Sequence, residues 1–208
     1  SGNTESVGVG TALRLDREGI DWTHSIRLRA DYQRQNGSTS REQFAASYEP
    51  RWQFDENIFA YGLAQYERDR IQGFSSRYSV SGGLGYRILD NPKLKLSLKA
   101  GPAYRVTDFT DGTSADRLAG LVGIDFDWQM LDRLKLTQDV EALAETGGEA
   151  TLIFDGANTT INLVTGLDFR VSNRLRSRLS YKVEYDSNPP AGSEGTDTLT
   201  RATLIYGF

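Results

Sequence analysis

Few side chains in this sequence of 208 residues are suited to catalysis. It contains one histidine, His24, and no cysteine, which excludes thiolate nucleophiles, thiolate metal sites and disulfides. If His24 were a catalytic base, it would need a serine nucleophile beside it and a third group to orient its ring. We find no serine placed to meet His24, so we interpret it as a structural residue beside Trp22.

Two pairs of acidic residues are the other candidates for chemistry. Asp125 and Asp127 lie two residues apart, and Asp139 and Glu141 repeat that spacing in the following segment. Paired carboxylates act as general acid and base when the pKa of one of them is raised in a cleft. The preceding segment carries basic residues at the same spacing, which favours ion pairing with Lys93, Lys95, Lys99 and Arg105. We therefore expect no catalytic residue, no metal site and no cofactor.

The segments that must position these residues have a period of two. In "WTHSIRLRADYQ", residues 22–33, the even positions are mostly apolar and the odd positions are polar. The alternation returns in most later segments, among them "KLKLSLKAGPAYRV", "RLAGLVGIDFDWQM" and residues 174–186 and 197–208. Such a period predicts about eleven β-strands. "NIFAYGLAQYERDR" is apolar on both faces, and there we assign outward positions to Ile58, Ala60, Gly62, Ala64 and Tyr66.

The connections between these segments are expected to differ in length on the two rims. "DREG", "FDEN", "LDNPK", "MLDR" and "VSNR" have the composition of tight turns. The intervening connections are longer and polar: "RQNGSTS", "RIQGFSS", "TDGTSAD", "ETGGEATLIFDGAN" and "DSNPPAGSEGTD". Short periplasmic turns and longer extracellular loops are typical of outer-membrane barrels.

Alternation alone also fits a soluble barrel or sandwich with its apolar face inside. The expected strands of about 12 to 15 residues are longer than those of soluble sheets, and the chain ends in "LIYGF" with an aromatic residue. No stretch approaches the roughly 18 apolar residues of a membrane helix. We therefore predict an all-β, transmembrane, antiparallel up-and-down barrel in the bacterial outer membrane. Its aromatic girdle is expected to comprise Trp22, Tyr32, Phe44, Trp52, Tyr78, Tyr86, Tyr104, Trp128, Tyr181, Tyr185, Tyr206 and Phe208.

In that arrangement the polar faces line the lumen, where charges of both signs can pair. The predicted lumen residues are Arg27, Arg29, Asp31, Arg51, Arg77, Arg87, Lys95, Lys99, Arg105, Arg117, Asp125, Asp127, Lys135, Asp139, Glu141, Asp168, Arg170, Arg174, Arg176, Arg178, Lys182, Glu184 and Arg201. The basic series from Arg174 to Lys182, with Arg201, either draws anions through a pore or neutralises Glu184, Asp168 and Asp186.

Several stretches resemble the YdiY-like family, which is described as salt-induced outer-membrane proteins and classed as a domain of unknown function. They are "SGNTES", "YERDR", "GYRILD", "AGPAYR", "LTQD" and "NPPAGSEGTDT". The resemblance implies an outer-membrane barrel of Gram-negative bacteria and brings no established activity, so no catalytic residue is transferred. In the family an earlier strand precedes "SGNT", which here opens the chain. The first and last predicted strands also run the same way, so we expect about twelve strands in the native protein, with the first one preceding residue 1, or else an unusual barrel of eleven.

We expect residues 1–208 to form one domain with a non-enzymatic role, either a structural barrel related to envelope or salt stress or a narrow small-solute pore. The alternatives are a lipid- or peptide-acting enzyme at the rim, and an adhesin or receptor acting through the loop with Pro189 and Pro190. The expected partners are outer-membrane lipid and, through Phe208, the barrel assembly machinery, with a monomer favoured. A net charge of -4 with interleaved signs argues against nucleic acid.

Overall fold

The computed structural model describes residues 6–145, 159–172, 175–189 and 194–206. They form one antiparallel sheet of eleven strands, each paired with the next in sequence, which confirms the predicted fold class and strand number. The strands are β1 (Ser6–Glu18), β2 (Trp22–Gln35), β3 (Ser38–Gln53), β4 (Ile58–Asp69), β5 (Phe74–Asp90), β6 (Leu94–Phe109), β7 (Ser114–Leu131), β8 (Leu134–Glu145), β9 (Thr159–Arg170), β10 (Leu175–Asp186) and β11 (Thr196–Tyr206). In the described part of the chain, no helix has the length and apolar character needed to cross a membrane.

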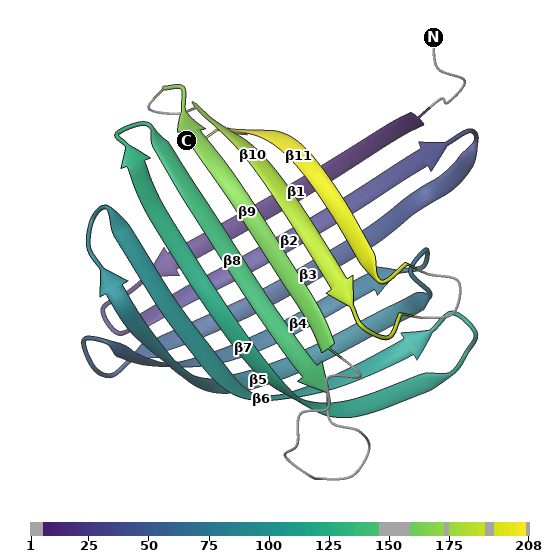
Figure 1. Ribbon diagram of the computed structural model, residues 1–208, viewed down its shortest axis with the longest axis horizontal. Helices are drawn as coiled ribbons and strands as arrows, with labels where there is room; N and C mark the ends of the chain where they lie inside the picture. The colour runs from purple at the N-terminus through teal and green to yellow at the C-terminus, as the bar shows by residue number, and fades with distance from the viewer. Residues whose placement is uncertain (1–5, 146–158, 173–174, 190–193, 207–208) are drawn as a thin grey trace.

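The sheet curls into an incomplete barrel with β1 and β11 at its two edges (Figure 1). Because every neighbouring pair is antiparallel, these two edge strands run in the same direction. Their backbones do not pair with each other, yet side chains connect the two ends of the sheet. Arg201 of β11 contacts Asp31 of β2, and Arg41 of β3 donates hydrogen bonds of 2.8 and 2.7 Å to Asp197 of β11.

The convex face of the sheet is apolar and the concave face is largely polar. Val80, Leu84 and Tyr86 on the convex face of β5 are 50 to 59% exposed, whereas Glu49 and Lys99 on the concave face are 1% and 2% exposed. A soluble barrel would have the opposite distribution. The buried apolar side chains also lie on the concave face, and we call them the apolar cluster: Phe59, Tyr61, Leu63, Ala103, Ala119, Leu121 and Leu143.

Strand β4 carries apolar residues on both faces because it contributes Phe59, Tyr61 and Leu63 to the apolar cluster. The alternate residues, from Ile58 to Tyr66, therefore lie on the convex side, as the sequence predicts. The ring of Tyr66 packs there between Phe44 and Tyr78, with centroid distances of 5.9 and 5.0 Å.

Three connections expected to be longer loops, "RQNGSTS", "RIQGFSS" and "TDGTSAD", are instead short, and the first is a tight hairpin. In "RQNGSTS" the strands continue until only Asn36 and Gly37 remain between them, with φ angles of 51° and 82°. An Asn-Gly pair with two positive φ angles forms the turn that matches the twist of a hairpin. The next two connections on this rim, 70–73 and 110–113, are also short. The longer ones are 146–158, which lies outside the described residues together with its "TLIF" run, and 187–195.

Glycines allow two strands to approach closely near the middle of the sheet. The pairing of β5 with β6 is interrupted at Gly82 and Gly83 on β5 and at Gly101 and Pro102 on β6. A Cβ atom at Gly83 would overlap the carbonyl oxygen of Ala100, and one at Gly101 would overlap that of Gly82. The absence of a side chain at Gly83 and Gly101 is therefore a condition for this approach.

Candidate functional site

The concave surface is crossed at its middle by a network of ion pairs. Lys99 on β6 donates hydrogen bonds of 2.8 Å to Glu49 on β3 and to Glu141 on β8. Arg51 on β3 lies 2.5 Å from both Glu49 and Asp125 of β7. We call Glu49, Arg51, Lys99, Asp125 and Glu141 the central brace. It connects strands that do not pair with one another, so it spans the lumen.

Glu49 and Lys99 of the central brace are buried, its other three members are half-buried, and the brace is nearly balanced in charge. Its two cations face three carboxylates, and Arg27 supplies a third cation 4.0 Å from Glu49. Buried ions are tolerated when their attraction and hydrogen bonds offset the loss of hydration. Aromatic rings add to this support, because Arg51 lies 5.0 Å from the centroid of Phe59 and Lys99 lies 5.6 Å from that of Tyr61.

The apolar cluster lies beside the brace, toward the rim with the longer connections. Lys99 pairs in register with Gly123, and the next inward row is Gly101, Leu121 and Leu143. Ala103 and Ala119 follow, and Arg105 stands opposite Arg117 beyond them. The lumen is thus layered along β6 and β7, with ions at the middle, apolar side chains above them and arginines near the rim.

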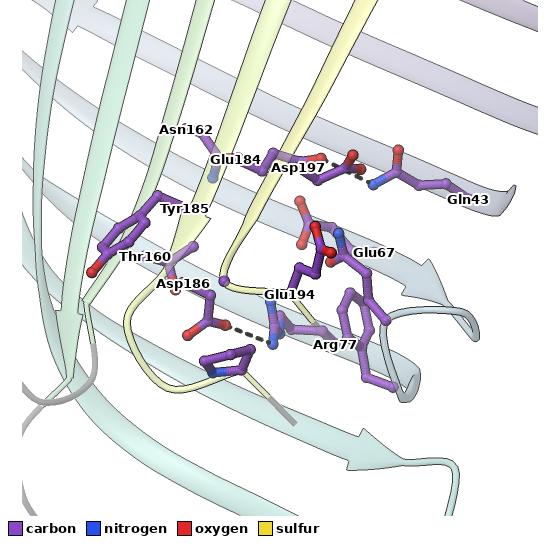
Figure 2. Close-up of a pocket in the computed structure, with 14 residues that line it drawn as sticks. Gln43, Glu67, Arg77, Thr160, Asn162, Glu184, Tyr185, Asp186, Glu194 and Asp197 are labelled. Carbon is purple, nitrogen blue, oxygen red and sulfur yellow. Dashed lines mark hydrogen bonds and ion pairs between the residues drawn. The ribbon is translucent and has the colours of Figure 1, made fainter. Parts of the chain in front are cut away.

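Two small cavities lie near that rim. The first, of about 30 Å³, is rich in acidic residues, and Figure 2 shows Glu67, Glu184, Asp186, Glu194 and Asp197 around it with Arg77. Several of these acids are already paired: Asp197 with Arg41, Glu184 with Lys182, and Asp186 with Arg77 at 3.9 Å. Pro189 also lines this cavity, and Pro190 lies outside the described residues. The second cavity, of about 130 Å³, is lined by Arg77, Arg105 and Arg117 together with Thr107, Thr160, Glu145 and Asp186.

The rim with the short turns carries separate ion pairs. Arg178 donates hydrogen bonds of 2.6 and 2.5 Å to Asp168, and Lys135 lies 2.9 Å from Asp127. Asp90 lies 3.3 Å from Arg87 and 3.5 Å from Lys95. The other predicted lumen residues have different surroundings. Arg29 lies 2.6 Å from Asp31, and Asp139 stands opposite Asp125 in the β7–β8 ladder. Arg170 and Arg176 are exposed. Arg174 lies outside the described residues.

The pairing differs in detail from the pattern expected between neighbouring strands. Lys99 does pair with Glu141, but Asp125 takes Arg51 from the far side of the lumen and Lys95 takes Asp90. Glu49, the most buried member of the brace, was not among the predicted lumen residues. The signal was present, because Glu49, Arg51 and Gln53 continue the polar period of two along β3.

The described side chains of the predicted aromatic girdle lie on the convex face. The residues toward the short turns are Trp22, Trp52, Tyr86 and Trp128. Those toward the other rim are Tyr32, Phe44, Tyr78, Tyr104 and Tyr185, and Tyr181 lies at the middle of β10; all are 40 to 50% exposed. The Tyr206 side chain and Phe208 lie outside the described part. His24 stacks between Trp22 and Tyr48, with its Nδ1 2.9 Å from the Tyr48 hydroxyl. Among the described residues, no cluster of histidines and carboxylates is arranged to hold a metal ion.

A family model covers the whole of this chain, residues 1–208, under the description "Protein of unknown function, DUF481". The chain belongs to this family. A relative, "Uncharacterized protein YdiY" of Escherichia coli (strain K12), is 26% identical over 209 residues, which cover 100% of this chain and 79% of the relative. The predicted resemblance to YdiY-like proteins is therefore confirmed.

Two solved structures share the fold of this DUF481 chain. A structure described as the NanC porin matches with a TM-score of 0.61 at 6% identity, over 99% of this chain and 97% of that one. The translocator domain of the autotransporter NalP from Neisseria meningitidis matches with a TM-score of 0.52 at 15% identity, over 99% and 79%. At these identities the likeness extends to the β-barrel architecture.

Proposed function

We propose that this protein is a non-enzymatic outer-membrane β-barrel that acts as a constricted, porin-like pore for small solutes. The apolar convex face supports the membrane location. The ten steps along the strand from Trp22 to Tyr32, at about 3.3 Å each and tilted by about 40°, span roughly 25 Å, the height of a lipid-facing band. The aromatic side chains lie toward the two ends of that span, and the porin-like architecture agrees with it.

The central brace carries the proposal of a constriction. Glu49 and Lys99 are 1% and 2% exposed at the middle of the lumen, and their contacts run between β3, β6, β7 and β8. Two cavities, of about 30 and 130 Å³, lie near one rim and not at the brace. A passage through the brace would admit ions and small polar solutes in preference to larger substrates.

Single-channel conductance of the native protein in a planar bilayer tests this function. We expect small, steady steps from the native protein and steps at least twofold larger from a Glu49→Ala/Lys99→Ala variant, because two long side chains leave the constriction. Lys135→Ala is the matched control, since Lys135 pairs with Asp127 at the rim rather than across the middle. No current from native and double-variant barrels that are both shown to be folded would overturn the pore.

The proposal includes a twelfth strand that closes the seam between β1 and β11. A membrane barrel needs every backbone N–H and C=O paired, because lipid offers no replacement partner. Both edge strands run in the same direction, so one strand antiparallel to each completes the barrel with an even number. A segment preceding β1 meets this requirement, and the E. coli relative has chain beyond the 79% that matches.

A hydrolase centred on His24 is not favoured. His24 stacks with Trp22 and Tyr48, and the Tyr48 hydroxyl occupies its Nδ1. We expect no lipid hydrolysis by the purified protein, measured with phospholipid vesicles; a hydrolytic activity lost in His24→Ala would establish the enzyme instead.

A role in salt or envelope stress belongs to the same proposal, and growth of a deletion strain in high NaCl tests it.

The remaining parts of the proposal concern partners. The protein acts as a monomer in outer-membrane lipid and is delivered there by the barrel assembly machinery, which reads the aromatic C-terminus at Phe208. An adhesin or receptor role at Pro189 would require a partner that is lost when the 188–195 loop is trimmed.

A further inference from the structure

Three arginines gather around the larger cavity near the long-loop rim. Arg77, Arg105 and Arg117 come from the consecutive strands β5, β6 and β7 and line the same space. Arg105 and Arg117 stand directly opposite each other on β6 and β7. Arg77 stands opposite Thr107, which is the next inward-facing residue after Arg105 on β6. Like charges directly opposite each other destabilise a sheet, so this placement calls for a compensating anion. We call the space lined by these arginines the arginine cavity.

The described acids match these arginines in number but not in contact. Glu145 and Asp186 also line the cavity, and Glu67 stands directly opposite Arg77 in the β4–β5 ladder. Glu145 forms an ion pair of 3.2 Å with Arg105, Asp186 lies 3.9 Å from Arg77, and Arg117 has no ion pair among the described residues. The Arg105 side chain is only 7% exposed. Its Nη1 also donates a hydrogen bond of 2.9 Å to the Thr160 hydroxyl, whereas its Nε has no hydrogen-bond partner within the described part of the chain.

The other arginines are engaged differently. The Nε of Arg77 donates to the Thr107 hydroxyl at 3.3 Å, and Nη1 of Arg117 donates to the backbone carbonyl of Asp116 at 2.9 Å. Neither of these bonds neutralises a guanidinium. Arg117 stands directly opposite the buried Arg105 and has no ion pair in the ranges that the structure describes, so an anion bound between these two guanidinium groups reduces their repulsion.

We propose that the arginine cavity binds a small oxyanion, with inorganic phosphate or a small carboxylate as the chemical type. Guanidinium groups match the oxygen spacing of these anions and form strong charge-assisted hydrogen bonds with them. The volume of about 130 Å³ is well above the roughly 10 to 15 Å³ that one water requires, so there is room for one such anion with part of its hydration. The hydroxyls of Thr107 and Thr160 add neutral hydrogen-bond donors to the same wall.

This inference rests on the proposed function only for its placement at the outer mouth of a pore. On β10, Arg178 and Lys182 are bound to Asp168 and Glu184, so the basic series there is already neutralised. Any anion preference of the pore therefore arises at the arginine cavity instead. An anion held there would stand above the apolar cluster and the central brace, at the entrance of the path.

Isothermal titration of the folded protein in detergent at low ionic strength tests the site without requiring conduction. The probe is sodium phosphate, with sodium acetate in a second arm to separate phosphoryl from carboxylate recognition, and methylammonium chloride as a cation control. We expect saturable phosphate binding with one site, reduced at least tenfold in Arg105→Gln, because a hydrogen bond to a charged group contributes about 1.5 to 3 kcal/mol. Arg87→Gln, which removes an arginine paired with Asp90 at the opposite rim, should leave the affinity unchanged.

The outcomes separate the site from the pore. Equal phosphate affinity in Arg105→Gln and Arg87→Gln, or no saturable binding by the folded native protein, would overturn the arginine cavity. If Arg105→Gln does not fold, Arg117→Gln replaces it, since Arg117 is exposed and donates to a backbone carbonyl, and a loss of about threefold is then expected. Phosphate binding by a protein that conducts no current would support the arginine cavity and reject the pore. A current from a protein that does not bind phosphate would reject the arginine cavity and leave the pore.

Discussion

At the scale of single residues, Lys99 connects three strands that do not pair with one another, β3, β6 and β8. Its ammonium group bonds Glu49 and Glu141 on different sides of the lumen, and its aliphatic stem lies over Gly123, where a Cβ atom would overlap it. The sequence places Lys99 on the inward face of its strand through the period of two. Its partner Glu49 lies 50 positions away, and only the curvature of the sheet brings the two together.

Replacing Lys99 by Met should therefore destabilise the barrel. Glu49 and Glu141 would lose a shared cation while staying largely buried, and we expect a loss of about 3 kcal/mol in the free energy of unfolding. The urea midpoint of refolding into detergent measures it. Adding Glu49→Gln to Lys99→Met should recover part of the loss, because one of the unpaired charges is then gone. A double variant less stable than Lys99→Met would show that Glu49 is held mainly by Arg51.

At the scale of strands, the close approach of β5 and β6 depends on backbone contact rather than on hydrophobic pattern. The pattern assigns both strands and their faces, but it is silent about the interruption at Gly82, Gly83 and Gly101. Gly83 and Gly101 lie on the inward face and Gly82 on the outward face. The period gives these faces but not the contact, because Gly85 shares the inward face and a Cβ there would meet only the Phe59 side chain.

We predict that Gly83→Ala lowers the yield of folded protein strongly, whereas Gly82→Ala is tolerated. A Cβ at Gly83 would overlap the Ala100 carbonyl, while one at Gly82 would lie 3.4 Å from the Tyr61 carbonyl, an ordinary contact. The two variants are adjacent in sequence and change the same atoms, so each controls for the other. Refolding yield, measured from circular dichroism and resistance to unfolding in sodium dodecyl sulfate, distinguishes them. Equal yields would mean that β5 and β6 separate there at little cost.

At the scale of the whole molecule, the main feature is the open seam, where the edge strands β1 and β11 have no backbone pairing with each other. The direction of the strands in the sequence pattern already indicates it. The described edge of β1 is highly exposed, with Val7 and Val9 at 69% and 67%. Arg201 already reaches from β11 to Asp31, over Gly10, where a side chain would collide with it. The two ends of the sheet are thus linked on the lumen side while their backbones remain unpaired.

We predict that the chain extended by a preceding strand forms a barrel that resists sodium dodecyl sulfate at room temperature and migrates faster unheated than heated. The 208-residue chain alone should not, because its edge N–H and C=O groups lack partners in an apolar environment. Gel migration before and after heating is the measurement, with light scattering to detect a second copy at the seam. A resistant monomer of the 208-residue chain would instead establish a barrel closed by eleven strands.

By itself, the sequence determined the class of this protein, its strands and the face of each strand, because a side-chain period of two is a local property of extended backbone. It also indicated that Asn36 and Gly37 belong to a turn, but not that they form a hairpin of only two residues. Only the tertiary structure decided which charges meet, since Arg51 finds Asp125 and Arg201 finds Asp31 across the curve of the sheet. The same holds for the arginine cavity, because the register of β5, β6 and β7 depends on backbone pairing, and a shift of two residues in one strand would leave its faces unchanged but separate Arg105 from Arg117.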